Sequence, residues 1–277
     1  SWLHLVREAE AADRLGPPDL GEAYDDAVRI AIRDQIEAGV DVISDGEMRR
    51  TTFIRGFYAR LTGLVPLPVP RRLGPLNYDT HCPYEVVGKL EAPRGLGIVD
   101  DFSFARAHAD RPLRVAVPGP MTLLMPLRRG GPYATEDALV ADLAAIVNRE
   151  MRGLVDAGCE FIQVDEPNYV MSAGKHRVLR AGPGPMLEVL RAIELWSQHA
   201  TTKEIAVGVV DVQAFRVESA EEVAARARLA LTHVPAERLW LVPDCGLWET
   251  PRWVAVSKLR SMVEAARLLR RELSGKR

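Results

Sequence analysis

The sequence has few cysteines, no long apolar run and no excess of charge of one sign. Its three cysteines are widely spaced among 277 residues, which excludes the disulfide framework of a small secreted domain. No apolar run is long enough to cross a membrane, and residues 1–4 begin no signal-peptide pattern. The 36 basic and 38 acidic side chains nearly balance, which gives no support for a nucleic acid or an anionic membrane as partner. We therefore expect a reduced, cytoplasmic protein.

Several ligand-binding motifs are also missing. No glycine-rich phosphate loop is present, since Gly-Pro-Gly-Pro at 182–185 reads as an ordinary loop. The six histidines show no His-x-x-x-His zinc spacing. His81 and Cys82 are adjacent, and neighbouring side chains on an extended chain point to opposite sides, so a metal shared by these two is disfavoured. Cys159 precedes a predicted strand, which favours a structural role.

What is present is a repeated strand–loop–helix pattern. A chain of 277 residues with 47% hydrophobic content suits a single α/β barrel domain. Parallel βαβ units are indicated by strands that alternate with helices. Strands are predicted at 40–43, 84–90, 113–117, 161–165, 205–210 and 239–242, and helices at 21–39, 135–157, 219–232 and 252–272. Residues 64–80, rich in Pro and Gly, are expected to form an inserted loop.

Residues 161–167, Phe-Ile-Gln-Val-Asp-Glu-Pro, are the most informative segment. The apolar start suits a strand buried on both faces of a parallel sheet. Pro167 cannot continue a central strand, so the strand ends at Asp165 and Glu166. In α/β barrels the carboxyl ends of the strands carry the chemistry. The segment thus predicts two acids at an active-site rim, although solvated loop acids remain the alternative.

Other predicted strands end in the same way. Their ends supply Asp45, Glu47, Asp211 and Cys245. Acids at such a rim can bind a substrate ammonium, act as a general base or hold a metal. A thiolate there can be a zinc ligand. The alternative for each acid is a helix N-cap or a solvated loop position, and for the cysteine a small buried apolar side chain.

Five segments, in this order, resemble the C-terminal catalytic domain of the cobalamin-independent methionine synthase family. They are residues 39–47 (Gly-Val-Asp-Val-Ile-Ser-Asp-Gly-Glu), 117–122 (Val-Pro-Gly-Pro-Met-Thr), 157–167, 208–219 and 242–247 (Val-Pro-Asp-Cys-Gly-Leu). Residues 258–270 are similar to the family's closing helix. The chain looks like the short family members that have a single barrel. The resemblance implies a (β/α)8 barrel over residues 1–277 and a methyltransferase of methionine biosynthesis, which acts on a thiol held by zinc.

The resemblance also implies roles for single residues. Asp165 matches the carboxylate that holds the amino group of homocysteine, and Glu47 matches a second carboxylate at that site. Glu166 is a further substrate-binding candidate beside Asp165. Cys245 matches the last zinc ligand. Gln213 stands where long family members carry a histidine proposed as proton donor, and an amide cannot shuttle a proton at neutral pH.

The zinc site is the largest departure from the family pattern. The resemblance implies a His-x-Cys pair and a glutamate between Pro167 and Ile205, and neither is present there. One interpretation is that segments are omitted from the printed sequence, at false joins 179–180 and 193–194. The other is a true deletion. We favour omission, because a barrel short of strands would expose sheet edges. A measured mass near 30.6 kDa would exclude omission.

The function implied is zinc-dependent methyl transfer to homocysteine or a similar amino acid thiol. The donor is methyl-folate, or methylcobalamin on a corrinoid protein. The donor-stacking tryptophan of the family would fall near Pro126 and Leu127, where none is present, and this weakens the folate hypothesis. One alternative is a thiol alkyltransferase of the epoxyalkane–coenzyme M type, although its sulfonate thiol would favour basic residues over Asp165 and Glu47. Another is a zinc-less barrel that only binds a ligand.

Overall fold

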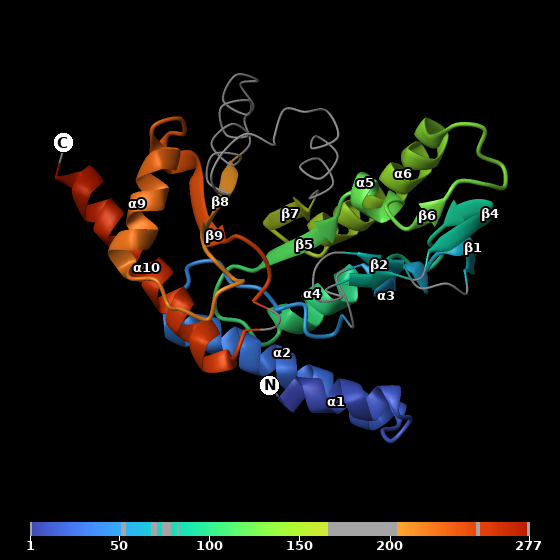
Figure 1. Ribbon diagram of the computed structural model, residues 1–277, viewed down its shortest axis with the longest axis horizontal. Helices are drawn as coiled ribbons and strands as arrows, with labels where there is room; N and C mark the ends of the chain where they lie inside the picture. The colour runs from blue at the N-terminus through green and yellow to red at the C-terminus, as the bar shows by residue number, and fades with distance from the viewer. Residues whose placement is uncertain are drawn as a thin grey trace. The chain divides into compact units, whose positions relative to one another are not determined.

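The computed structural model describes residues 2–50, 54–67, 71–73, 79–81, 83–165, 204–247 and 250–275. The chain divides into two compact units, which are described separately here (Figure 1). The N-terminal unit comprises Trp2–Arg33 and Asp41–Lys175. The C-terminal unit comprises Asp34–Val40 and His176–Arg277.

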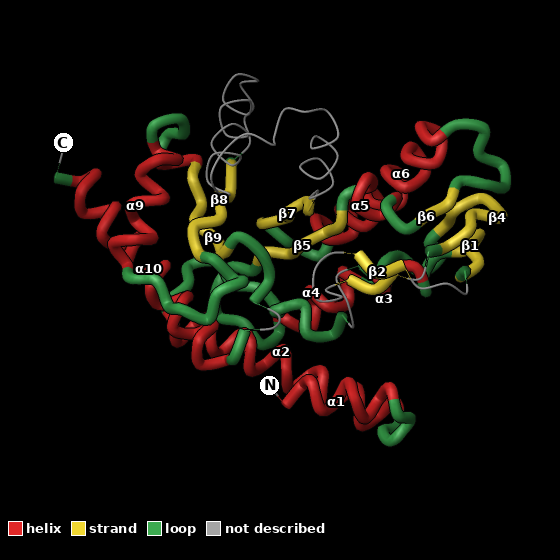
Figure 2. Tube along the Cα trace, in the orientation of Figure 1, coloured by secondary structure: helices red, strands yellow, loops and turns green. Residues whose placement is uncertain are grey.

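A parallel strand pair is the centre of the N-terminal unit. β5 (Arg114–Pro118) pairs with β7 (Phe161–Asp165) (Figure 2). In the register of this pair, Pro118 lies opposite Asp165. Ile43 adds one isolated parallel bridge to Leu113, so the predicted strand 40–43 is reduced to this bridge. β7 is less buried than predicted, since Val164 is 44% exposed. Among the described residues β7 pairs only with β5, which leaves its second edge without a partner there.

Helix α6 (Glu136–Asp156) lies between these strands in the sequence and packs on β5. Thr135 caps its first turn by accepting a hydrogen bond from the backbone N–H of Ala138. Gly158 follows the helix with φ +84°, a conformation that favours glycine. The structure confirms the predicted helix 135–157 and its two end signals.

A buried carboxylate of α6 also fixes the start of α4 (Ile98–Arg106). Glu150 is 5% exposed, and its two oxygens accept hydrogen bonds from the backbone N–H groups of Leu96, Ile98 and Val99. Leu96 lies just before the N-cap Gly97, whereas Ile98 and Val99 open the helix, where backbone N–H groups have no partner within the helix itself. The negative charge also matches the positive end of the α4 dipole.

A second sheet in this unit corrects the prediction for residues 84–90. β4 (Tyr84–Glu91) pairs antiparallel with β1 (Thr62–Pro66) and parallel with the short β6 (Leu127–Arg128). The strand therefore exists, but it does not join β5 and β7. Its alternating exposure is typical of a sheet with one face in water, and the partner strand could not be read from that pattern.

The expected loop 64–80 also contains strand structure. β2 (Arg71–Leu73) pairs antiparallel with β3 (Asp79–His81), and the end of β1 overlaps the start of the segment. Cys82 lies outside the described residues. The remaining helices of the unit are α1 (Trp2–Ala11), α3 (Arg55–Tyr58), α5 (Pro120–Leu124) and most of α2 (Pro17–Ala38).

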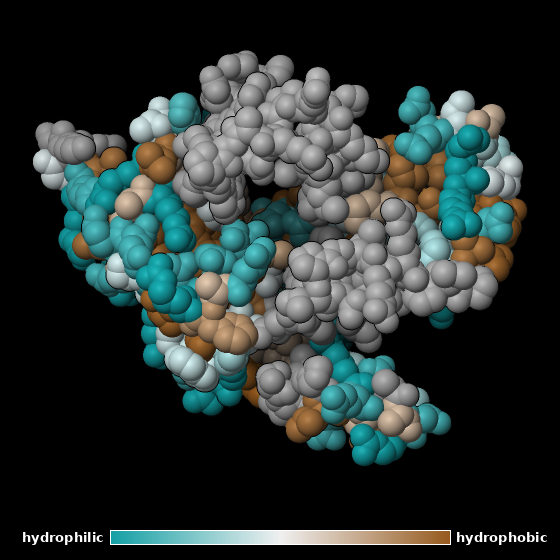
Figure 3. All heavy atoms as spheres, viewed as in Figure 1, coloured by the Kyte–Doolittle hydropathy of each residue, from teal (hydrophilic) through white to brown (hydrophobic). Residues whose placement is uncertain are grey.

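The C-terminal unit contains a parallel pair of its own. β8 (Ile205–Val210) pairs with β9 (Leu239–Pro243), and a short 3-10 turn, Ala236–Arg238, precedes β9. Helices α9 (Ala220–Leu231) and α10 (Arg252–Ser274) pack on the pair and on each other (Figure 1). Their apolar faces form a core with the strands, while hydrophilic atoms cover much of the surface over these helices in Figure 3.

The predicted helix 219–232 is confirmed together with its start. Ser219 and Glu222 form a capping box, in which each side chain accepts a hydrogen bond from the other residue's backbone N–H. Four predicted strands are thus present as two parallel pairs, and the described residues form no closed barrel. None of the described helices is long and apolar enough to span a membrane.

Candidate active site

The predicted site residues are distributed over the two units. Glu47 and Asp165 belong to the N-terminal unit, and we call them the acidic pair. Gln213 and Cys245 belong to the C-terminal unit. Glu166 lies outside the described residues.

Asp165 ends β7, and three hydrogen bonds fix it there. Its backbone carbonyl accepts from the N–H of Gly119 at 2.9 Å and from the hydroxyl of buried Thr122 at 3.2 Å. Its Oδ1 accepts from Nε2 of Gln163 at 2.6 Å. Gln163 and Asp165 are two residues apart on one strand, so their side chains leave the same face. Backbone and carboxylate are therefore both held before any ligand binds.

Glu47 lies in a tight turn that begins at Ser44. The N–H of Gly46 donates to the hydroxyl oxygen of Ser44 at 3.2 Å, and the N–H of Glu47 donates to Oδ1 of Asp45 at 3.0 Å. Glu47 itself has φ +54°, a strained value for a residue with a side chain. A Cβ on Gly46 would come within 2.9 Å of the Ala31 side chain, so this turn requires glycine at 46. Such strain is often found at functional sites.

Arg50 anchors the side chain of Glu47. Its Nη1 lies 3.0 Å from Oε2 of Glu47, and its Nη2 donates to the carbonyl of Ala116 on β5 at 2.8 Å. Burial raises the pKa of Glu47, Arg50 opposes this, and the charges of Asp45 and Asp165 raise the pKa further. The acidic pair is therefore close enough for its two charges to interact. A ligand cation that binds there would relieve this repulsion.

A small hollow beside the pair contains a further acid that the sequence did not single out. Asp45, Arg50, Asp101 and Arg114 line it together with apolar side chains. Burial first, and then the charge of Asp45, raise the pKa of Asp101 to about 6. Nothing in the sequence distinguishes Asp101 from other acids, and Arg50 carries no motif of its own. Only the folded chain shows that they share this environment.

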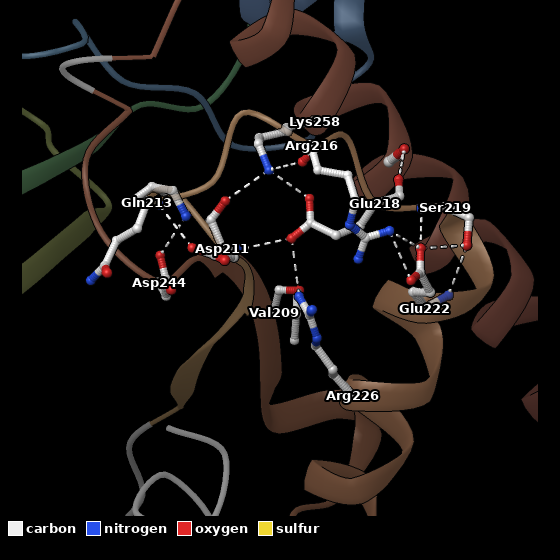
Figure 4. A network of polar contacts seen from close by, with 12 residues as sticks. Val209, Asp211, Gln213, Arg216, Glu218, Ser219, Glu222, Arg226, Asp244 and Lys258 are labelled. Carbon is white, nitrogen blue, oxygen red and sulfur yellow. Dashed lines mark hydrogen bonds and ion pairs between the residues drawn. The ribbon is translucent and has the colours of Figure 1, made fainter. Parts of the chain in front are cut away.

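In the C-terminal unit, Gln213 follows β8 in a short turn. Its backbone N–H donates to Oδ1 of Asp211 at 2.8 Å (Figure 4). The side chain of Asp211, a predicted site acid, therefore stabilises the backbone of this turn. Gln213 thus lies just beyond the carboxyl end of the parallel strand β8.

Cys245 follows β9 in the turn Pro243–Gly246, and its side chain is exposed. Asp244 ties this turn to β8: its N–H donates to the carbonyl of Val210 at 2.9 Å, and its Oδ1 accepts from the N–H of Val212 at 3.1 Å. The approach is so close that a Cβ on Gly208 would lie 2.6 Å from Cα of Asp244. The turns that carry Gln213 and Cys245 are thus joined directly.

A thiol at this place fits one ligand of a zinc ion, since Cys245 is accessible at a strand end. The described residues bring together no group of three His, Cys, Asp or Glu side chains that could hold a metal. Cys159, by contrast, is buried at the opposite end of β7, and burial raises the pKa of its thiol. This agrees with the structural role predicted for Cys159.

Comparison with known proteins decides the family. The family described as the catalytic domain of cobalamin-independent synthase matches residues 5–182 and 186–268. The chain belongs to this family. It is 32% identical to the methionine synthase of Saccharolobus solfataricus over 314 aligned positions, which cover 99% of this chain and 93% of that protein. The methionine synthase of Sulfurisphaera tokodaii is 31% identical, with coverage of 99% and 90%.

Solved structures give the same result. A B12-independent methionine synthase from Shewanella sp. W3-18-1, in complex with selenomethionine, superposes with a TM-score of 0.76 at 26% identity. The superposition covers 95% of this chain and 92% of the Shewanella chain. A putative B12-independent methionine synthase from Listeria monocytogenes, at 20% identity and a TM-score of 0.66, shares the fold, with coverage of 96% and 93%. These relatives confirm the predicted family, a mixed α/β fold and the predicted class of enzyme, a methyltransferase.

The alignments also bear on the departure from the family pattern. The alignment with the Saccharolobus protein has 314 positions, more than the 277 residues of this chain, so the relative has residues where this chain has none. The family match is interrupted between residues 182 and 186. This interruption falls within the stretch from Pro167 to Ile205 in which the expected His-x-Cys pair is missing.

Proposed function

We propose that the protein transfers a methyl group to the thiol of homocysteine and forms methionine. The observation that carries the proposal is the acidic pair, in which Asp165 is fixed by Gln163 and Thr122 and Glu47 is fixed by Arg50. Two carboxylates whose charges interact suit the ammonium group of an amino acid substrate. The methionine synthase relatives and the selenomethionine complex of the Shewanella protein support the same substrate class.

In this proposal the acidic pair binds and orients the substrate through its amino group. Arg50 and Gln163 hold the two carboxylates in place before the substrate binds. The side chains therefore lose less conformational entropy on binding. Glu166 is proposed as an additional substrate-binding residue. Gln213 is proposed at the position of the family's proton donor, although an amide can donate and accept hydrogen bonds but cannot deliver a proton at neutral pH.

Zinc is the proposed cofactor, with Cys245 as one of its ligands. When bound, the ion lowers the pKa of a thiol and keeps the sulfur nucleophilic. We further propose that residues 1–277 form one (β/α)8 barrel domain. The resemblance and the α/β architecture of the relatives support this arrangement.

Methyl-folate is the proposed methyl donor, since the family is described as cobalamin-independent. The comparisons do not support a corrinoid protein as partner. They also do not favour the coenzyme M alkyltransferase or the zinc-less binding barrel, because the relatives named above are methionine synthases.

A methyl-transfer assay tests the proposal. Homocysteine is offered with methyl-folate and, separately, with methylcobalamin, and we expect turnover with the folate. Asp165→Asn should raise the KM for homocysteine about 30-fold, which corresponds to about 2 kcal/mol for a hydrogen bond to a charged group. The matched control is Glu160→Gln, which removes an exposed charge before the other end of β7. An unchanged KM in Asp165→Asn would refute the assigned role.

Metal analysis tests the cofactor. The wild-type chain and Cys245→Ser are purified with excess zinc and measured for bound metal. We expect stoichiometric zinc in the wild type and a clear loss in the variant. Less than about 0.2 zinc per wild-type chain would remove the zinc-dependent mechanism, because thiolate chemistry of this kind needs the ion.

A further inference from the structure

Lys258 on α10 is a fully buried cation, with 0% of its side chain exposed. All three of its N–H donors are used (Figure 4). They reach the carbonyl of Asp211 at 2.8 Å, the carbonyl of Arg216 at 2.6 Å and Oε2 of Glu218 at 2.7 Å. The two carbonyls lie at the two ends of the turn that contains Gln213. One ammonium group therefore bridges the two ends of this turn.

Glu218 completes the network from the other side. Its side chain is 3% exposed, and its Oε1 accepts from the N–H of Asp211 at 2.8 Å and from Nη1 of Arg226 at 3.1 Å. The same nitrogen of Arg226 also donates to the carbonyl of Val209 at 2.8 Å. Burial alone would raise the pKa of Glu218, but the hydrogen bonds from Lys258, Asp211 and Arg226 lower it to about 2. The carboxylate of Glu218 is therefore ionised at neutral pH.

A buried ion pair is a costly way to stabilise a fold. Two charges lose their hydration, and an apolar pair of similar size is often as stable or more stable. Apolar side chains, however, cannot hold the N–H and carbonyl groups of Asp211 or the carbonyl of Arg216. What the ion pair supplies is thus a fixed backbone path for residues 211–218.

This path carries predicted site residues. Gln213 lies within it, held through Asp211. The N–H of Val212 donates to Asp244, the residue next to Cys245, so the path also contacts the second turn. No side chain of the buried pair is exposed enough to meet a substrate, so any effect on the reaction passes through these two turns.

We propose that Lys258 and Glu218 are positioning residues, whose buried pair holds Gln213 and the turn with Cys245 in the arrangement that methyl transfer requires. The proposal rests on the proposed function and deepens it. Arg226 supports the pair from α9 and has a smaller share in the same role.

The double variant Lys258→Met/Glu218→Leu tests the proposal, since it replaces the pair by apolar side chains of similar size. We expect it to unfold in one cooperative transition, to lose about 10- to 100-fold in kcat, and to keep the KM for homocysteine within about 3-fold. The KM is spared because the acidic pair lies on other elements. A folded double variant with the kcat of the wild type would overturn the proposal.

A milder matched pair of variants keeps the test decisive if the double variant does not fold. Arg226→Met and Arg228→Met change the same residue type on α9, two positions apart. Arg226 contacts Glu218, whereas Arg228 pairs with Glu272 of α10 at the surface at 2.6 Å. We expect kcat to fall about 3- to 10-fold in Arg226→Met and to stay unchanged in Arg228→Met. Equal kcat in both would overturn the proposal.

The wild-type chain separates this inference from the proposed function. If wild type shows no methyl transfer to homocysteine, the proposed function fails. If wild type is active and both network variants keep its kcat, only the positioning role fails.

Discussion

Nε2 of Gln163 donates a 2.6 Å hydrogen bond to Oδ1 of Asp165, two residues farther along β7. The bond fixes the direction of the carboxylate that is proposed to bind the substrate ammonium. We expect Gln163→Leu to raise the KM for homocysteine about 10-fold with little change in kcat. Without the hydrogen bond the carboxylate is no longer oriented, and substrate binding loses about 1.4 kcal/mol of free energy. Steady-state kinetics measure this. A lower kcat at constant KM would show that Gln163 acts elsewhere.

The cap on α4 predicts a stability effect far from the acidic pair. Glu150→Gln replaces one oxygen by an NH2 group that faces backbone N–H donors, so at least one buried donor loses its acceptor. We expect the free energy of unfolding to fall by about 2 kcal/mol in urea titrations. The neighbouring exposed residue gives the control, since Arg149→Gln should stay within about 0.5 kcal/mol of wild type.

The raised pKa of Asp101 predicts a pH effect of known sign. Because the folded-state pKa is about 6 and the ordinary value is 3.8, the folded chain binds an extra proton between these values. Stability therefore falls as pH rises from about 4 to about 6. Asp101→Asn lacks this loss, so it should gain about 2 kcal/mol relative to wild type across that window. Asp100→Asn, the exposed neighbour in the same helical turn, should follow the wild-type profile.

The close approach of Gly208 to Asp244 predicts a further effect. In Gly208→Ala the new methyl group meets backbone at 2.6 Å, so the turn that carries Cys245 must shift. We expect a loss of about 2 kcal/mol in the free energy of unfolding, together with weaker zinc retention. Gly21→Ala on α2 has nothing within 4 Å of its new Cβ and should stabilise by about 0.5 kcal/mol. A stable Gly208→Ala chain with full zinc would contradict the packing argument.

Local chemistry explains which elements could be predicted from the sequence. Thr135 and Gly158 bound α6, and Ser219 with Glu222 starts α9, because caps act over a few residues. Pairing partners act over long sequence separations. The pattern of residues 84–90 predicts a strand, but it does not show that β1 and β6 are its neighbours.

The candidate site also has residues that can be read from local sequence and residues that cannot. Asp165 and Cys245 could be singled out as candidates because each lies at or just beyond the carboxyl end of an apolar strand. Two cations hold the site, and both resemble ordinary surface cations in the sequence. Arg50 is three residues from Glu47 but also bonds the distant carbonyl of Ala116, and Lys258 lies far along the chain from the turn with Gln213. Whether a charged side chain is buried depends on the tertiary structure, so it cannot be predicted from the local sequence.

The core of the C-terminal unit has a consequence for folding kinetics. Its buried residues, from Val207 to Leu269, all come from one continuous stretch of chain. The contacts of β8, β9, α9 and α10 in this core therefore need no residue from elsewhere in the chain, which favours folding of the stretch as one cooperative unit. In pulse-labelling hydrogen exchange, we expect the amides of β8 and β9 to gain protection together, in one cooperative step.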